Sequence, residues 1–139
     1  MAISQSMCAS FKSEVLGGIH DLDTDTIKIA LYTSSATLGS GTTAYSATNE
    51  VSGTGYTAGG NTLTSPVISL DGTTAIVGFA DSTWFTATIT ARGALIYNAS
   101  KSNRAIAVLD FGEDKTSTSG NFTVQFPAAA ASTAIVRLA

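Results

Sequence analysis

The sequence predicts an all-β protein, either a β-sandwich or a jelly-roll-like barrel, with one short α-helix near the N-terminus. After residue 26 the chain shows dense strand-and-turn patterning, in which several segments alternate apolar and polar residues with the period of a β-strand. Turn-forming residues interrupt these runs at intervals of roughly 8–12 residues, as in sandwiches and barrels. With 139 residues the chain is expected to form a single β-sandwich domain over 1–139, with an N-terminal arm and helix at about 1–22.

The helix is expected over about residues 10–20. Apolar residues recur there at spacings of three or four, which places them on one helical face. A Gly-Gly pair in the same stretch weakens the helix, because each glycine costs about 1 kcal/mol relative to alanine. We therefore predict a short helix that lies over the sheet or over a neighbouring subunit. The residues of the apolar face are Phe11, Val15, Ile19 and Leu22.

Beyond residue 26 the apolar period changes from helical to alternating. Residues 27–32 predict a half-buried strand. Residues 34–60 are rich in Gly, Ser and Thr and predict a long loop with little to offer a core. Loops of this length in a compact domain are usually functional or disordered. Tyr45 and Tyr56 within it argue against a plain linker, because the amphipathic tyrosine ring prefers a contact.

Further strands are expected in close succession after residue 60. Pro66 favours an edge strand or a bulge, Asp71-Gly72 predicts a hairpin turn, and Gly93 predicts a kink. Residues 113–120 are interpreted as a charged loop. The expected strands are 63–70, 74–80, 86–98, 105–111, 122–126 and 135–138.

Residues that perform chemistry are rare in this chain. It has one histidine, one cysteine and 12% charged residues. Cys8 has no second cysteine with which to form a disulfide, and no G-x-S-x-G elbow supplies a nucleophile for His20. We therefore predict a protein that is not an enzyme, with no catalytic residue and no cofactor.

Three aspartates form a pattern that suggests a metal at first sight. Asp21, Asp23 and Asp25 have the spacing that begins an EF-hand loop. That loop then requires Gly at its sixth position and Glu at its twelfth, where this chain has Thr26 and Tyr32. The pattern is interpreted as a solvated connection between helix and strand, and no metal is predicted.

Charge and hydropathy limit the kinds of partner. The net charge is −3 and the seven Lys and Arg residues are scattered, whereas a nucleic-acid surface needs clustered basic residues. No segment reaches the roughly 18 apolar residues of a membrane helix, and the N-terminus lacks the pattern of a secretory signal. We expect neither nucleic acid nor a membrane as partner, and a protein that is assembled in a cytoplasm or released by lysis.

Trp84 and Phe85 form a compact aromatic pair with more than one interpretation. The pair fills the core at a corner of the sheet, or it forms a platform for a carbohydrate, or it anchors an interface. With a single tryptophan in the chain we favour the core. A carbohydrate-binding module would use Trp84 and the loop tyrosines Tyr45 and Tyr56 as its platform, which a glycan array with the wild type and Trp84→Ala tests.

A series of strings, in order along the chain, resembles a known family. They are SFKSEVLGGIHDL, DTIKIALYTSSATL, TAYSATNEVSGTGYTAGG, FADSTWFTATITARGALIYN, RAIAVLDFGEDKT and AIVRLA. Together they are similar to small virion proteins of tailed bacteriophages, over nearly the whole chain from about residue 10. The most distinctive parts are Asn49–Tyr56 and Ala91–Tyr97. The resemblance implies a virion setting, and it carries over no catalytic residues.

This resemblance, on a weakly charged β-scaffold, predicts a capsid decoration (cement) protein that stabilises the mature shell by bridging major capsid subunits. The expected partners are the major capsid protein and copies of itself, as a dimer or trimer. The expected location is the virion, assembled in the host cytoplasm. A tail, adaptor or fibre component of the same virion is the alternative, and a carbohydrate-binding module is the third.

The residues expected to contact partners come from the N-terminal arm, the helix start, the long loop and one later strand. Apolar and aromatic side chains supply contact area, and polar ones supply specificity. Ordinary packing within the chain is the competing interpretation for each of them. The candidates are Ile3, Met7, Phe11, Tyr45, Asn49, Glu50, Tyr56 and Arg92.

Overall fold

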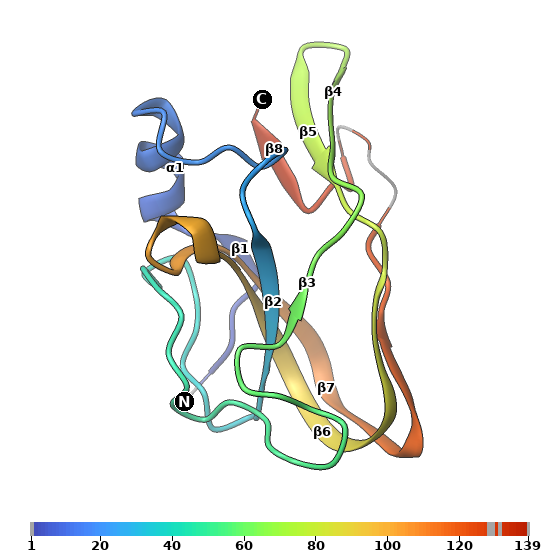
Figure 1. The fold of residues 1–139 in the computed structure, drawn as a ribbon. Helices are drawn as coiled ribbons and strands as arrows, with labels where there is room; N and C mark the ends of the chain where they lie inside the picture. The colour runs from blue at the N-terminus through green and yellow to red at the C-terminus, as the bar shows by residue number, and fades with distance from the viewer. Residues whose placement is uncertain (1, 128–129, 131, 139) are drawn as a thin grey trace.

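The computed structural model describes residues 2–127, 130 and 132–138. These residues form two antiparallel sheets with one short helix near the N-terminus, so the all-β, sandwich-like class is confirmed (Figure 1). The larger sheet has the strand order β1-β7-β6-β2-β3, and the smaller has the order β4-β5-β8. The elements are β1 (Ser6–Met7), α1 (Ala9–Leu16), β2 (Ile27–Tyr32), β3 (Asn61–Thr62), β4 (Val67–Asp71), β5 (Thr74–Gly78), β6 (Ser82–Asn98), a 3-10 turn (Ala99–Lys101), β7 (Arg104–Val124) and β8 (Val136–Leu138).

Helix α1 lies against β7 and is shorter than the sequence predicted. Gly17 is its C-cap, and Gly18 follows with a φ of 75°, a left-handed conformation that ends a helix. The predicted extension to residue 20 was therefore wrong. Phe11 is the buried residue of the helix, so this side chain fixes α1 to the core.

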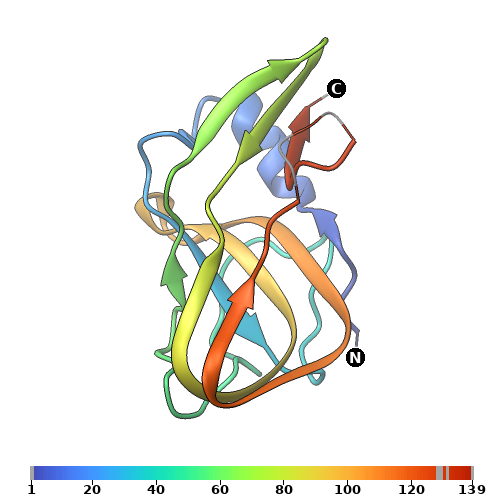
Figure 2. The same cartoon turned by 90° about the vertical axis from the view of Figure 1, so that its right-hand side faces the viewer.

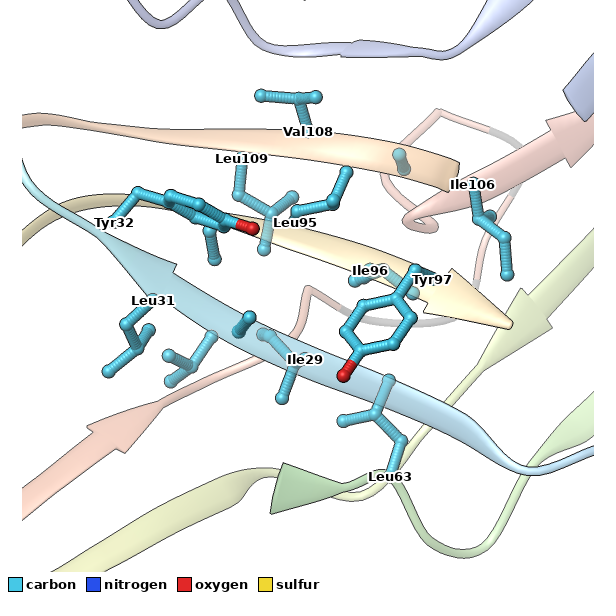
Figure 3. Close-up of a cluster of buried hydrophobic side chains, with 14 of the residues drawn as sticks. Ile29, Leu31, Tyr32, Leu63, Leu95, Ile96, Tyr97, Ile106, Val108 and Leu109 are labelled. Carbon is cyan, nitrogen blue, oxygen red and sulfur yellow. The ribbon is translucent and has the colours of Figure 1, made fainter. Parts of the chain in front are cut away.

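Strand β2 is buried on both faces, whereas the sequence predicted a half-buried strand. Figure 3 shows Ile29, Leu31 and Tyr32 within a cluster of buried apolar side chains. The long loop contacts β2, because the Tyr32 hydroxyl donates to the Ser46 carbonyl oxygen at 2.6 Å. The loop also supplies Val51 to the core. The expectation that the loop has little to offer the core was therefore wrong.

Strands β6 and β7 form a long, strongly curved ribbon in the larger sheet (Figure 2). Residues 113–120, predicted to be a loop, instead continue β7, because exposed threonines fit the pleated surface of a strand. Thr90 and Thr116 pair across the ribbon, with their hydroxyl oxygens 3.0 Å apart. The predicted kink is confirmed by a register shift at Gly93, where a Cβ would lie 2.5 Å from the Leu109 carbonyl oxygen.

The smaller sheet projects from the body of the molecule through the β4–β5 hairpin (Figure 1). The predicted turn is confirmed, because Asp71 pairs with Thr74 and Gly72 takes a φ of 62° between them. Of the strand predicted over residues 63–70, only residues 67–70 form one, as part of β4. Residues 63–66, which end at Pro66, instead link β3 in the larger sheet to β4 in the smaller. The predicted C-terminal strand is present as β8, paired with β5.

Candidate functional site

Glu50 is the centre of a hydrogen-bonded cluster that holds the 34–60 loop. Its carboxylate accepts hydrogen bonds from the Tyr45 hydroxyl at 2.6 Å, from the Tyr56 hydroxyl, and from the Gly59 N–H at 2.8 Å. The Tyr56 oxygen in turn accepts from the Leu31 N–H at 2.9 Å, which joins the loop to β2. One carboxylate thus fastens the loop to the larger sheet.

The rings of the two loop tyrosines are also held within the chain. Tyr45 stacks on Tyr97 with ring centroids 4.7 Å apart, and Tyr56 stacks on Trp84 at 6.0 Å. Burial, together with the hydrogen bond to Glu50, raises the pKa of both loop phenols. The phenols therefore stay protonated and continue to donate to the carboxylate. These predicted contact residues come together in the structure, but their polar groups are engaged inside the chain.

The other predicted contact residues are dispersed over the fold. Ile3 and Phe11 lie in the core and retain almost no exposed surface, so their side chains are not available to a partner. Met7 is half-buried in β1. Asn49 is exposed, and Arg92 is half-buried in an ion pair that links β6 and β7.

A second polar cluster joins α1 to the turn between β6 and β7. The buried His20 side chain lies 2.9 Å from Glu14 through Nε2 and 3.0 Å from Asn98 through Nδ1. Asn98 Oδ1 accepts a hydrogen bond from the Ser100 N–H, so Nδ2 is the group that this amide turns toward His20. The same Nδ2 donates to Asp25 at 2.8 Å. His20 Nδ1 must therefore accept, which assigns the ring proton to Nε2 and to the bond with Glu14.

Two carboxylates of this second cluster are held in their ionised form. Burial opposes ionisation of Glu14, but hydrogen bonds from His20 and Arg104 outweigh it, and the pKa of this carboxyl is lowered. The hydrogen bond from Asn98 is the main cause of the lowered pKa of Asp25. Since these pKa values are lower in the folded chain than in the unfolded chain, both groups stabilise the fold above their unfolded pKa. That stability is lost as the pH falls through the folded pKa.

We therefore expect acid to weaken the protein through Asp25, at a pH below about 4. Replacing Asp25 by Asn should lower the free energy of unfolding at neutral pH by about 1–2 kcal/mol and reduce the further loss on acidification. Thermal unfolding followed by circular dichroism from about pH 7 to about pH 3 measures both effects. Asp23→Asn changes an exposed carboxylate of the same segment and is the control. Parallel pH profiles for wild type and Asp25→Asn would contradict this assignment.

The three aspartates considered as metal ligands do not converge on a common point. Asp21 Oδ1 accepts hydrogen bonds from the N–H groups of Asp23 and Thr24, which closes a turn. Asp25 instead faces Asn98. Among the described residues, no three His, Cys, Asp or Glu side chains gather in a group able to hold a metal ion.

Trp84 and Cys8 are both interior residues. Trp84 is 3% exposed and packs edge-on to Phe122, so the core interpretation is confirmed for Trp84 but wrong for the pair as a whole, and the Trp84 ring presents no platform to a carbohydrate. Its neighbour Phe85 is 69% exposed. Burial raises the pKa of the Cys8 thiol to about 11, so the thiol stays protonated and unreactive at neutral pH.

The smaller sheet carries an exposed apolar surface that the sequence did not indicate. Paired residues of neighbouring strands lie on the same side of a sheet, and on one side of this sheet all the side chains are apolar. Part of that side is uncovered, with Ile68 53%, Leu70 73% and Leu138 40% exposed. A groove of about 370 Å³ lies between it and helix α1. We call this side the apolar face; it consists of Ile68, Leu70, Ala75, Val77, Val136 and Leu138.

No protein-family model matches this chain, and no curated protein or solved structure matches it either. Within the described residues, no helix combines the length and the apolar character that a membrane span needs. The geometry of the chain itself is therefore the basis for a functional proposal. Its main polar clusters are engaged internally, and its apolar face lies on a projecting sheet.

Proposed function

We propose that this protein is a structural protein of a bacteriophage virion, and that it serves there as a capsid decoration (cement) protein. The observation that carries the proposal is the partly exposed apolar face of the smaller sheet, which projects from the body of the molecule (Figure 1). Exposed apolar surface of this kind marks a site of contact with another protein. The virion setting is supported by the resemblance of the chain to small virion proteins of tailed bacteriophages.

The proposed mechanism is thermodynamic. The protein binds across the seam between major capsid subunits on the mature shell, and it buries surface that only this lattice presents. Binding to one state of an equilibrium stabilises that state by mass action. Many copies on a symmetric shell multiply a modest contact through avidity. The partners are thus the major capsid protein and further copies of this chain, assembled in the host cytoplasm.

Particles of a phage that encodes this chain are expected to carry on the order of hundreds of copies at regular positions on the shell. Quantitative mass spectrometry of purified particles measures the copy number, and electron microscopy gives the position. A tail, adaptor or fibre component would instead be present in a small fraction of that number at one vertex. Purified particles that contain none of this protein would contradict both assignments.

A further inference from the structure

We infer that β4 pairs edge to edge with β4 of a second copy of this chain, about a two-fold axis that passes beside Ser69. The two smaller sheets then form one six-stranded antiparallel sheet. This pairing deepens the proposed function and rests on it for its biological setting, because it specifies how copies of the protein contact each other. The edge geometry, the register and the side chains of β4 each support it.

Strand β4 is an edge of its sheet, since in the described part of the chain it pairs with β5 alone. The hairpin closes over a two-residue loop, so Asp71 and Thr74 form the hydrogen-bonded pair next to the turn. Bonding alternates along an antiparallel pair, and Ser69 therefore also directs its backbone groups at β5. Ile68 and Leu70 direct their N–H and C=O groups outward, to the free edge.

One antiparallel register of two β4 strands matches all these outward groups. It places Ile68 of each copy opposite Leu70 of the other, and each such pair exchanges two backbone hydrogen bonds. Ser69 then meets its own counterpart on the axis as a pair without hydrogen bonds, in which the Cα atoms approach to about 4.5 Å. A shift of the register in either direction sets Pro66, which has no N–H, or the turn residue Gly72 opposite an outward group.

The side chains of β4 fit the same register. Ile68 packs beside Leu70 of the second copy, so the apolar faces of the two sheets become continuous. Natural edge strands are usually protected by charged side chains, but residues 67–70 carry no charge. Asp71 falls opposite Val67, and the two carboxylates lie at opposite ends of the contact. A second copy is therefore the matching occupant of this edge, and a two-fold contact of this kind closes after two copies.

Ser69→Cys tests the register directly. Under mild oxidation most of the purified variant is expected to form a disulfide-linked dimer, with twice the 14.1 kDa chain mass on a non-reducing gel. Thr118→Cys places a thiol at an exposed position of β7 and is the matched control, expected to cross-link far more slowly. The wild type controls for Cys8, which is buried.

Leu70→Lys tests the contact without a cross-link. Size-exclusion chromatography with light scattering measures the mass of each protein. A loading concentration of about 100 µM is used because a short edge contact buries little area. The expected mass is twice 14.1 kDa for the wild type and 14.1 kDa for Leu70→Lys. Phe85→Lys removes a comparably exposed apolar side chain outside the smaller sheet and should leave the dimer mass unchanged. Circular dichroism confirms that each variant is folded.

A monomeric wild type, or equal cross-linking rates for Ser69→Cys and Thr118→Cys, would overturn the inference. A dimer that persists in Leu70→Lys would overturn it as well, since the copies would then meet elsewhere. These assays use purified protein alone. A dimer in solution together with absence from virions would therefore refute the proposed function and leave the pairing intact. A monomer in solution together with presence in virions would refute the pairing alone.

Discussion

Replacing Gly60 by alanine is expected to lower the free energy of unfolding by about 4 kcal/mol, or to prevent folding altogether. A Cβ at this position would lie 1.8 Å from the Ile29 carbonyl oxygen and 2.8 Å from the Ala30 Cα. Gly60 also has a φ of 79°, which disfavours any side chain. Both obstacles are backbone atoms of β2, a strand buried on its two faces, so neither moves aside cheaply.

Urea unfolding followed by circular dichroism measures this loss. Gly41→Ala is the matched control, because it adds the same methyl group where no heavy atom lies within 4 Å. The control should stay within about 0.5 kcal/mol of the wild type. A soluble Gly60→Ala variant with the urea midpoint of the wild type would show that the loop crosses β2 at a different place.

Replacing Glu50 by alanine is expected to cost about 3 kcal/mol of stability. The change removes the acceptor of three hydrogen bonds and leaves the hydroxyls of Tyr45 and Tyr56 and the N–H of Gly59 without it. Unpaired polar groups in a partly buried site cost more than the bonds themselves contribute. Because Tyr56 stacks on Trp84, the fluorescence of this tryptophan should change together with stability.

The chemical denaturation midpoint and the tryptophan emission maximum check this prediction. Glu113→Ala removes a carboxylate whose side chain is 75% exposed, and it should change neither quantity appreciably. Glu50→Gln keeps one oxygen acceptor but turns an amide donor toward a second donor, so its stability should lie between those of the wild type and Glu50→Ala. Equal stability of Glu50→Ala and Glu113→Ala would contradict the anchoring role of Glu50.

Local sequence signals predicted the parts of the fold that depend on backbone conformation. Asp71-Gly72 predicted a turn because a tight hairpin turn favours a residue that tolerates positive φ. Gly93 predicted the kink, and the structure leaves no room for a side chain there. Pro66 predicted an edge strand or a bulge, and it lies directly before the edge strand β4, because proline supplies no ladder hydrogen bond. Each of these signals acts over a few residues, which is why a single sequence shows it.

The errors share a different physical cause. Residues 113–120 resemble a loop in composition, and only pairing with the distant β6 makes them part of a strand. Tyr45, Glu50 and Tyr56 were predicted to contact a partner, and their hydrogen bonds to each other were not predicted, because these depend on how the long loop folds back. The apolar face draws on three separate strands, so no one segment indicates it.

The second polar cluster was missed for the same reason. His20 meets Asn98 across most of the length of the chain, and neither residue carries a local motif. Asn98 is fully buried, which is unusual for an asparagine. This burial, which the sequence alone does not show, marks Asn98 as part of a polar cluster. The second polar cluster therefore depends on contacts between residues far apart in the sequence, which local propensities do not predict.

The pairing of β1 with β7 has a consequence for synthesis on the ribosome. Ser6 pairs with Val108, and Cys8 donates its N–H to the Ile106 carbonyl oxygen. A nascent chain therefore holds its first strand without a partner until β7 has emerged from the exit tunnel. Folding of the larger sheet is thereby delayed to a late stage of translation. Until then, β1 and the residues around it stay unpaired and exposed to binding by chaperones.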